Sequence, residues 1–379
     1  MFTYQKTNRY FAQLADSLEP LGAQELEELG ASDIKPAYRG AYFTADPETL
    51  YRIVYQTRLC TRILAQLLSF DCHSTKYLYK TARNIPWDEL LTLEQTFAVD
   101  AVTVNSRFRH SQYAALCLKD AVVDHFRERT DRRPDVDTDA PHLLLNLYVD
   151  RNRASISIDT SGGSLHRRGY RKEAVAAPMQ ETLAAAVIRL TGWQGERMLI
   201  DPMCGSGTLL AEALMLAARI PPGFLRQRFG IEALPDFDRP LWLKLRKEAD
   251  LAMDQTAARL ISGSDADRGA VRAAMTNLKE LPGGTGVRVT TKRFQEIDQI
   301  RDSVIVCNPP YGIRLEQGRD MAAFMRELGD FFKQRCTGST AYLYLGDREL
   351  LKSVGLKPAW KKPLANGGLD GVLAKYELY

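Results

Sequence analysis

The stretch MLIDPMCGSGTLLAEA, residues 198–213, decides the fold of this 379-residue chain. Its first residues are apolar and end on Asp201, a turn containing Gly205 and Gly207 follows, and the last residues have helical spacing. Glycine in a turn lets the backbone pass close to a ligand. Strand and helix patterns alternate on both sides of this stretch with the spacing of parallel strands, which predicts a doubly wound α/β domain.

The residues around this turn indicate the ligand. A nucleotide phosphate is one possibility, because helix N-termini favour anions. However, the third Gly of a GxGxxG pattern and a Lys are both missing, and Asp201 would repel a phosphate. An acid here suits a ligand with a positive end, such as S-adenosylmethionine with its ammonium and sulfonium; a turn with only a structural role is the alternative. The cofactor-binding residues expected here are Asp201, Pro202, Cys204, Gly205, Ser206, Gly207 and Thr208.

The next strand ends in GSDAD, residues 263–267. A carboxylate at this place can accept hydrogen bonds from two ribose hydroxyls, so we expect Asp265 and the adjoining Ala266 to bind the cofactor. Asp267 is expected to start the following helix, and an Asp that only caps a helix is the alternative for the whole motif. Residues 220–250 form an insertion between the two motifs, which we expect to pack helically beside the site.

The stretch VIVCNPPYG, residues 304–312, places an amide, two prolines and an aromatic ring directly after a buried strand. This order suits methylation of a planar exocyclic amine. The side-chain oxygen of Asn308 and the carbonyl of Pro309 can each accept one amine hydrogen, and both bonds strengthen as positive charge develops. Pro309 and Pro310 stiffen the loop, and Tyr311 can stack on the base. Asn308 is also expected to contact the cofactor, and a rigid turn is the alternative for the stretch.

The N-terminal half carries no cofactor motif. Residues 9–70 have the order strand, helix, strand, strand, helix, strand, which is the ferredoxin-like arrangement. An α/β pattern continues to about residue 163, with an amphipathic helix at 113–130 and two strands within 142–162. Three groups of basic residues could contact RNA. The stretch HRRGYRK (166–172) could instead be a solvated linker, and Arg58 and Arg62 could pair with local acids. The remaining group could be only the polar face and end of a helix: Arg127, Arg129, Arg132 and Arg133.

Composition and charge limit the partners. The net charge of +4 and the pI near 8.6 permit a polyanionic partner without requiring one. The six Cys form no CxxC pair and the five His are scattered, so we expect no metal site and reduced thiols in a cytoplasmic protein. The opening MFTYQKTNRY lacks an apolar core, and no run of about 18 apolar residues occurs, so we expect neither a signal peptide nor a membrane span.

These motifs resemble those of the class I S-adenosylmethionine-dependent methyltransferases that act on amines. The resemblance covers nearly the whole chain, because the motifs occur in the order found in one family. In sequence these are the N-terminal unit, LKDAVVDHFR, HRRGYR, DPMCGSGT, FGIEALPDFDRPLW, NPPYG and NGGLDG. That family is the THUMP-containing ribosomal RNA guanine methyltransferases, and the chain resembles most the N-terminal part of a bifunctional member. Members are often labelled adenine-specific DNA methylases because they share NPPY.

The resemblance implies three domains and a reaction. We expect a ferredoxin-like domain at residues 1–60, a THUMP RNA-binding domain at 61–163 and a class I, Rossmann-like methyltransferase domain at 164–379. The implied reaction transfers a methyl group from S-adenosylmethionine to the exocyclic amine of a guanine in 23S rRNA and leaves S-adenosylhomocysteine. The residues themselves leave three alternatives: an adenine-N6 DNA methyltransferase, a tRNA guanine-N2 methyltransferase, and a non-catalytic RNA-binding assembly factor. The THUMP-like half argues against DNA, and the intact motifs argue against loss of activity.

The resemblance also assigns site residues by position. Asp201, Gly205 and Gly207 match the family's cofactor loop, Asp265 matches its ribose-binding acid, and residues 308–311 match its catalytic loop. There is one departure. The family commonly has an acid near the adenine after the third strand, whereas this chain has Lys292-Arg293-Phe294. No adenine contact is therefore carried over to that turn.

Overall fold

The computed structural model describes residues 1–108, 110–175, 178–254, 256–310, 320–366 and 369–379. The chain divides into two compact units. The first comprises Met1–Leu14, Gly22–Leu165 and Arg226–Arg246, and the second comprises Ala15–Leu21, His166–Leu225 and Lys247–Tyr379. Tyr311 and Gly367-Gly368, which the sequence analysis singled out, lie outside the described residues. No described helix has the length and hydropathy needed to cross a membrane.

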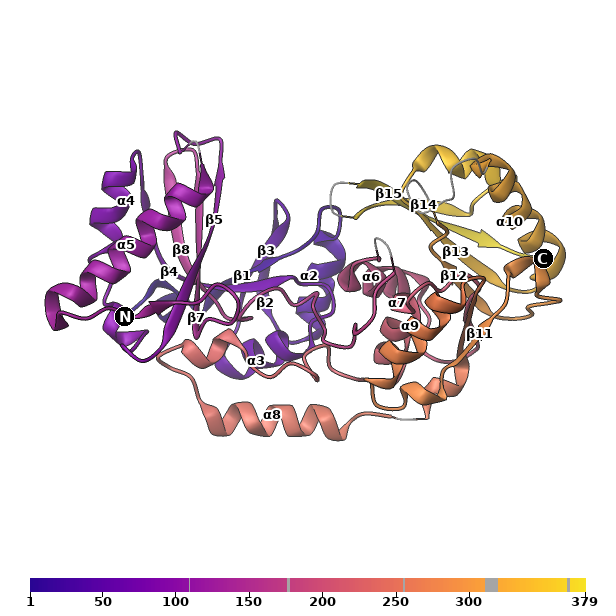
Figure 1. Ribbon diagram of the computed structural model, residues 1–379, viewed down its shortest axis with the longest axis horizontal. Helices are drawn as coiled ribbons and strands as arrows, with labels where there is room; N and C mark the ends of the chain where they lie inside the picture. The colour runs from indigo at the N-terminus through magenta and orange to yellow at the C-terminus, as the bar shows by residue number, and fades with distance from the viewer. Residues whose placement is uncertain (109, 176–177, 255, 311–319, 367–368) are drawn as a thin grey trace. The chain divides into compact units, whose positions relative to one another are not determined.

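The described strands of the first unit form a single mixed eight-stranded sheet (Figure 1). Its N-terminal part contains α1 (Thr3–Thr7), β1 (Arg9–Gln13), α2 (Glu19–Glu28), β2 (Ser32–Ala37), β3 (Gly40–Thr44), α3 (Pro47–Gln56) and β4 (Arg62–Asp71). The predicted order is confirmed, and the strands pair antiparallel as β2-β3-β1-β4, the ferredoxin-like order. α3 begins where its sequence indicates, because Pro47 occupies the first turn and Asp46 accepts a hydrogen bond from the Thr49 N–H.

The following segment extends this sheet. It contains α4 (Thr75–Ala82), β5 (Thr96–Val104), α5 (Ser111–Thr130), β6 (Asp135–Val136), β7 (Leu143–Asp150) and β8 (Arg153–Asp159). β4 pairs with β1 on one side and with β8 on the other, so one strand joins the two parts of the sheet. The strand pattern of the sequence did not reveal this junction, because pairing between distant strands is not a local property.

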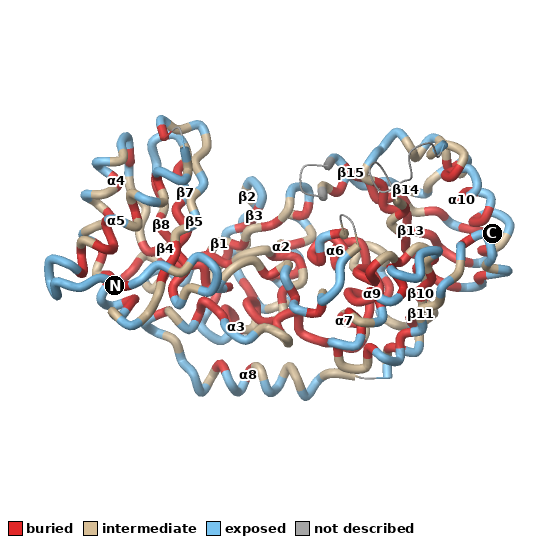
Figure 2. The backbone as a smooth tube through the Cα atoms, in the orientation of Figure 1, coloured by how far each residue is buried: buried red, intermediate tan, exposed pale blue. Residues whose placement is uncertain are grey.

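The second unit is a doubly wound α/β domain, as predicted. Its elements, with α8 shared between the units, are α6 (Glu181–Thr191), β9 (Leu199–Asp201), α7 (Thr208–Ala217), α8 (Arg239–Leu251), β10 (Ile261–Asp265), α9 (Arg268–Lys279), β11 (Arg288–Thr291), β12 (Val304–Cys307), α10 (Met321–Arg335), β13 (Thr340–Leu345), β14 (Trp360–Asn366) and β15 (Leu369–Glu377). The described strands stand in the order β11-β10-β9-β12-β13-β15-β14, and β15 runs antiparallel to β13. β12 and β13 are buried along their whole length (Figure 2), as expected for parallel strands covered on both faces.

Helices cover both faces of this second sheet. α10 packs on one face, where Phe324 and Leu328 belong to the same core cluster as Ile305 of β12. α7 packs on the other face and approaches β10 closely. Glycine at position 263 permits this approach, since a Cβ there would lie 2.6 Å from Leu210 Cδ1 of α7. The carboxyl ends of β9, β10 and β12 lie at one edge of the sheet, where ligands bind in doubly wound folds.

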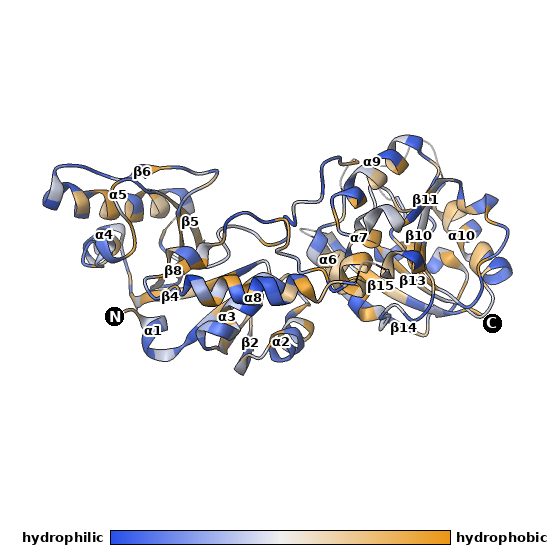
Figure 3. Ribbon diagram, turned by 90° about the horizontal axis from the view of Figure 1, so that it is seen from below, coloured by the Kyte–Doolittle hydropathy of each residue, from blue (hydrophilic) through white to orange (hydrophobic). Residues whose placement is uncertain are grey.

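The insertion at residues 220–250 is partly helical, as expected, and its residues 226–246 pack in the first unit. The reason is an aromatic cluster. Trp242 of α8 is buried, and its ring centroid lies 6.0 Å from that of Tyr51 and 5.6 Å from that of Tyr55, both on α3. Hydrophobic and hydrophilic residues alternate along α8 (Figure 3), so α8 buries its apolar side against α3.

Candidate active site

Backbone hydrogen bonds hold the loop between β9 and α7 in place. The Gly207 N–H donates to the Cys204 carbonyl at 2.8 Å, and the Cys204 N–H donates to the Ser264 carbonyl of β10 at 2.9 Å. Gly205 and Gly207 have φ angles of 53° and 80°, in the left-handed region that favours glycine. A Cβ at Gly207 would also lie 3.0 Å from the Ala274 Cβ. The turn therefore favours glycine at both positions, more strongly at Gly207, where the added Cβ would also be crowded.

Asp265, at the end of β10, binds the same loop. Its Oδ2 accepts a hydrogen bond from the Gly205 N–H at 2.9 Å, and its Oδ1 accepts one from the Asp267 N–H at 3.0 Å. Asp267 starts α9 as predicted, because its side chain accepts a hydrogen bond from the Gly269 N–H. Each Asp265 oxygen keeps a second lone pair for a ribose hydroxyl, and the neighbouring Ala266 is exposed. This carboxylate thus orients the loop as well as presenting acceptors.

Asp201 is a buried carboxylate at the end of β9. It is 1% exposed, and its Oδ1 accepts a hydrogen bond from the Met203 N–H at 3.0 Å. The pKa of Asp201 is raised to about 8, mainly by burial; the Met203 hydrogen bond lowers it, and the charge of Asp265 contributes to raising it. A cation bound beside Asp201 would offset the cost of burying its charge, so the site suits a ligand with a positive end.

A small pocket lies at this loop and the end of β12. It brings together these predicted residues: Asp201, Cys204, Gly205, Ser206, Thr208 and Asn308. Its lining also includes residues that the motifs did not indicate: Val175, Pro178, Met179, Met203 and Leu209. The other described candidates are not among its lining residues: Pro202, Gly207, Asp265, Ala266, Pro309 and Pro310. The pocket is therefore acidic at one point and otherwise mostly small or apolar.

Asn308 follows the buried strand β12 directly and lines this pocket. Its Oδ1 is buried and has no hydrogen-bond partner among the described residues. A buried acceptor without a partner costs free energy, and such groups are rare in native proteins. The atom is therefore available for a donor from a bound molecule. Pro309 after it is buried, which keeps the start of the loop against the domain.

Family models match three segments of the chain. The model described as "RMKL-like, methyltransferase domain" matches residues 168–375, the THUMP domain matches 72–159, and the RlmL ferredoxin-like domain matches 9–64. The chain belongs to the RMKL-like methyltransferase family.

Related proteins agree with this assignment. The chain is 39% identical to slr0064 of Synechocystis sp., named as a candidate RNA methyltransferase, over 98% of this chain and 97% of that protein. It is 37% identical to the ribosomal RNA large subunit methyltransferase K/L of Syntrophotalea carbinolica, over 98% of this chain but only 53% of that protein. The chain thus spans about half the length of that K/L enzyme.

Solved structures share the whole architecture. SMU.472, a candidate methyltransferase complexed with SAH, has a TM-score of 0.86 and 28% identity, and the match covers 98% of both chains. A protein of Listeria monocytogenes described as a predicted N6-adenine-specific DNA methylase has a TM-score of 0.82 and 28% identity, over 99% of this chain and 97% of that one.

Asn277 of the methyltransferase domain is a site residue that the sequence analysis missed. It is buried on α9, and its Nδ2 donates to the carbonyls of Ser206 and Glu173 at 3.0 and 2.8 Å. Its Oδ1 accepts hydrogen bonds from the N–H groups of Lys172 and Glu173 at 2.8 and 3.0 Å. Asn277 therefore joins the loop between β9 and α7, called the glycine loop below, to the backbone at residues 172–173, which precede the pocket-lining Val175. One polar residue within an amphipathic helix gives no local signal of such a role.

The basic stretch at residues 166–172 is largely built into the methyltransferase domain. Arg168 is buried, and its Nε lies 3.4 Å from Glu212 Oε1 of α7. The hydroxyl of Tyr170, also buried, donates to the same carboxylate at 3.2 Å. Arg171 Nε donates to Glu181 Oε1 of α6 at 2.9 Å. The centre of this stretch is thus neither a solvated linker nor a free RNA-binding surface.

Several candidate RNA-contacting arginines pair with local acids. Arg62 pairs with Asp100 at 2.7 Å and also with Asp159. Arg129 lies 2.7 Å from Asp88. These pairs favour the structural alternative for these arginines. The described residues contain no cluster of three or more His, Cys, Asp and Glu that could hold a metal ion.

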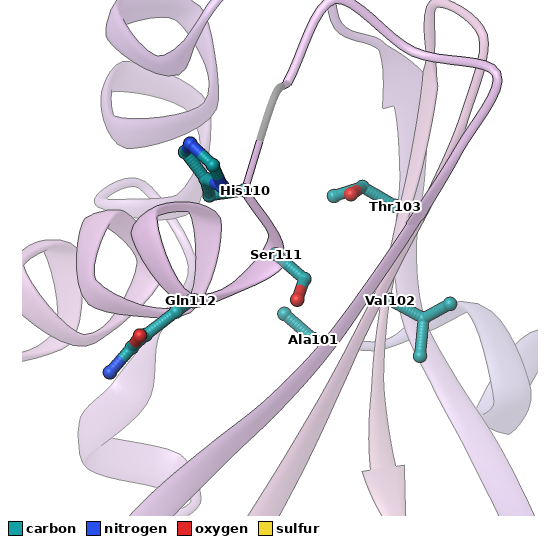
Figure 4. Close-up of a pocket in the computed structure, with 6 residues that line it drawn as sticks. All are labelled: Ala101, Val102, Thr103, His110, Ser111 and Gln112. Carbon is teal, nitrogen blue, oxygen red and sulfur yellow. The ribbon is translucent and has the colours of Figure 1, made fainter.

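A second hollow lies in the segment matched by the THUMP model, between β5 and the first turn of α5 (Figure 4). Its lining residues are Ala101, Val102, Thr103, His110, Ser111 and Gln112. None of them was singled out from the sequence, and none carries a permanent charge.

Proposed function

We propose that this chain transfers a methyl group from S-adenosylmethionine to the N2 amine of a guanine in 23S rRNA. The observation that carries the proposal is the buried Oδ1 of Asn308, which has no hydrogen-bond partner among the described residues; Asn308 lines the same pocket as Asp201 and the loop between β9 and α7. An acceptor for an amine hydrogen and a carboxylate for a cationic cofactor therefore share one small space.

The donor set fits S-adenosylmethionine. Asp201 would face the cofactor's positive end, and the backbone of Gly205 and Gly207 leaves room where a Cβ would be strained. Asp265 would accept hydrogen bonds from the ribose hydroxyls with its free lone pairs. When bound, the cofactor supplies a methyl group from its sulfonium and leaves as S-adenosylhomocysteine. The SAH complex of SMU.472 supports the same cofactor for this chain.

Asn308 and Pro309 would prepare the amine. The lone pair of a guanine amine is delocalised into the ring, so the amine is a poor nucleophile. Asn308 Oδ1 and the Pro309 carbonyl would each accept one amine hydrogen and favour a tetrahedral nitrogen. Both hydrogen bonds strengthen as the nitrogen becomes positive, which stabilises the transition state more than the ground state. The methylated, cationic amine is acidic and loses its proton to water, so no strong base is required.

RNA is favoured over DNA by the N-terminal half of the chain. The THUMP match at residues 72–159 adjoins a ferredoxin-like match, and relatives that match 98% of this chain carry RNA methyltransferase names. The name of the Listeria structure keeps adenine in DNA as the second candidate. Transfer RNA and a non-catalytic assembly role are the remaining alternatives. With a ribosomal substrate, the protein would act in the cytoplasm, which is the location that we propose.

The test compares methyl transfer into unmodified 23S rRNA, tRNA and duplex DNA, followed by digestion to nucleosides. We expect N2-methylguanosine from 23S rRNA. Methyladenine from DNA, guanosine methylation in tRNA, or no labelled product with any substrate would each overturn the proposal.

The variant Asn308→Ala tests the role of the acceptor. Turnover should fall about 10²- to 10³-fold, by analogy with the loss of one transition-state hydrogen bond, while the affinity for S-adenosylhomocysteine stays within twofold. Asn308→Asp, which keeps an acceptor oxygen in the same place, is the matched control and should retain more turnover. If the alanine variant keeps the parental rate, Asn308 does not act on the amine.

A further inference from the structure

One face of the first unit's sheet exposes aromatic and basic side chains. Along β1 and β3, Tyr10 and Phe43 are buried, whereas Arg9 and Tyr42 are exposed and Phe11 is half-buried. Phe11 and Tyr42 are direct partners in the antiparallel register, so both side chains stand on the same face. β1 and β3 are the two central strands of the ferredoxin-like part of the sheet.

The rings on this face form a prepared cluster. The centroids of Phe11 and Tyr42 are 4.8 Å apart, with their planes inclined at 57°. The guanidinium of Arg9 lies over the Tyr42 ring, 4.7 Å from its centroid. Gly40 makes room for the Phe11 ring, because a Cβ there would collide with it. Tyr38, in the turn between β2 and β3, is 79% exposed.

The cluster extends to β7 through the joined sheet. Tyr148 is 40% exposed, as is Tyr42. The strand register places Tyr148 on the same face as Phe11. Tyr148 pairs with Ser155 of β8, and Ser157, two residues on, pairs with Gln66 of β4. Leu64, two residues before Gln66, pairs with Phe11, and residues that pair or lie two apart share a face. Lys35 of β2 is exposed and stands opposite Tyr42 in the register, which adds a second cation beside Arg9.

We propose that this aromatic platform, formed by Phe11, Tyr38, Tyr42 and Tyr148, binds a single-stranded segment of the RNA substrate by base stacking. Exposed rings offer π faces to any unpaired base, and stacking of this kind tolerates sequence changes. Four-stranded sheets that bind single-stranded RNA use aromatic rings in the same way. Arg9 and Lys35 are placed to contact phosphates.

The chemistry of the face favours this occupant over a folded protein. Cations border the rings, so the surface complements a chain that alternates planar bases and negative phosphates. A duplex hides its bases in the stack and cannot use the rings in this way. The inference rests on the proposed RNA substrate and deepens it, because it assigns an unpaired segment to the ferredoxin-like sheet and leaves the methylated base to the other unit.

The test measures binding of the full chain to fluorescein-labelled ten-nucleotide U and A single strands and to a ten-base-pair RNA duplex. Phe11→Leu and Tyr42→Leu keep apolar volume but remove the π face. We expect each to weaken single-strand binding about 5- to 150-fold, the range for one stacked base. Tyr42→Phe should bind like the parent, since it keeps the ring. Tyr379→Leu, at a 97% exposed tyrosine of the second unit, is the matched control and should also bind like the parent.

Two further readouts separate this proposal from the proposed reaction. Affinity for S-adenosylhomocysteine should stay parental in all variants, and strands containing 4-thiouridine should crosslink to peptides covering residues 9–13 or 40–44. Parental single-strand binding by both leucine variants, or crosslinks only at other segments, would overturn the platform. If the variants lose RNA binding but the parent methylates no guanine, the platform is supported and the proposed reaction fails.

Discussion

The proton on Asp201 should control cofactor affinity, and Asp201→Asn isolates this effect. Burial raises the pKa of Asp201 to about 8, so the ligand-free protein holds this carboxyl mostly protonated at pH 6. A cationic ligand requires the carboxylate, so binding at pH 6 must first remove the proton. Two pH units below the pKa this costs about 2.7 kcal/mol, at 1.36 kcal/mol per unit, or about 100-fold in Kd. Asn keeps an oxygen for the Met203 N–H, so the loop should keep its position.

The assay is calorimetric titration of the full chain with S-adenosylhomocysteine between pH 6 and pH 9. The parent's affinity should rise about tenfold per pH unit up to about pH 8 and then level off. The affinity of Asp201→Asn should be weak and independent of pH over this range. A flat profile for the parent, or the same slope in the variant, would refute the assignment of Asp201 to the ammonium of S-adenosylhomocysteine.

The same pKa sets the sign of a stability effect. The ordinary pKa of this group is 3.8, so between about pH 4 and pH 8 the native state holds a proton that the unfolded state has released. The ligand-free protein should therefore lose stability as the pH rises through this range, and Asp201→Asn should remove that part of the dependence. Urea unfolding at pH 5 and pH 8 checks this. The variant should gain stability relative to the parent at pH 8, and an unchanged difference would contradict the linkage.

Three substitutions test other contacts. Asn277→Ala should destabilise the protein by about 1–3 kcal/mol and weaken S-adenosylhomocysteine binding, because it leaves buried backbone groups unpaired; Met275→Ala, exposed on the same helix, should do neither. Trp242→Ala should cost about 3–5 kcal/mol in urea unfolding and leave cofactor affinity parental, whereas Leu243→Ala, more than half exposed, should have little effect. Gly207→Ala should cost about 1–3 kcal/mol and lower cofactor affinity, because its left-handed φ strains any side chain.

Each of these has an outcome that would contradict its reasoning. If Asn277→Ala binds the cofactor as the parent does, the side chain does not position the loop. If Trp242→Ala instead lowers the affinity for the cofactor, the insertion supports the cofactor site, as the sequence analysis expected. If Gly207→Ala melts at the parental temperature, the loop tolerates a side chain there.

The local motifs were readable from the sequence because short-range physics decides them. The glycines of the β9–α7 loop follow from the left-handed turn that precedes α7, and Asp267 follows from the need to cap α9. Alternation of apolar residues marked the strands, and its change to helical spacing marked the helices. Each of these features depends on residues within a few positions of one another, so their order along the chain predicted most strands of both sheets; the short strand β6 was not predicted.

Contacts between distant segments were decided only by packing. β4 joins two parts of one sheet because it pairs with β1 and β8, and Trp242 is held against Tyr51, far from it in sequence. Asn277 looks like any polar helix residue until the chain folds the glycine loop onto it. The raised pKa of Asp201 comes from the burial that the surrounding elements impose. Burial and pairing depend on which segments meet in space, and a linear pattern records only what each segment is able to form.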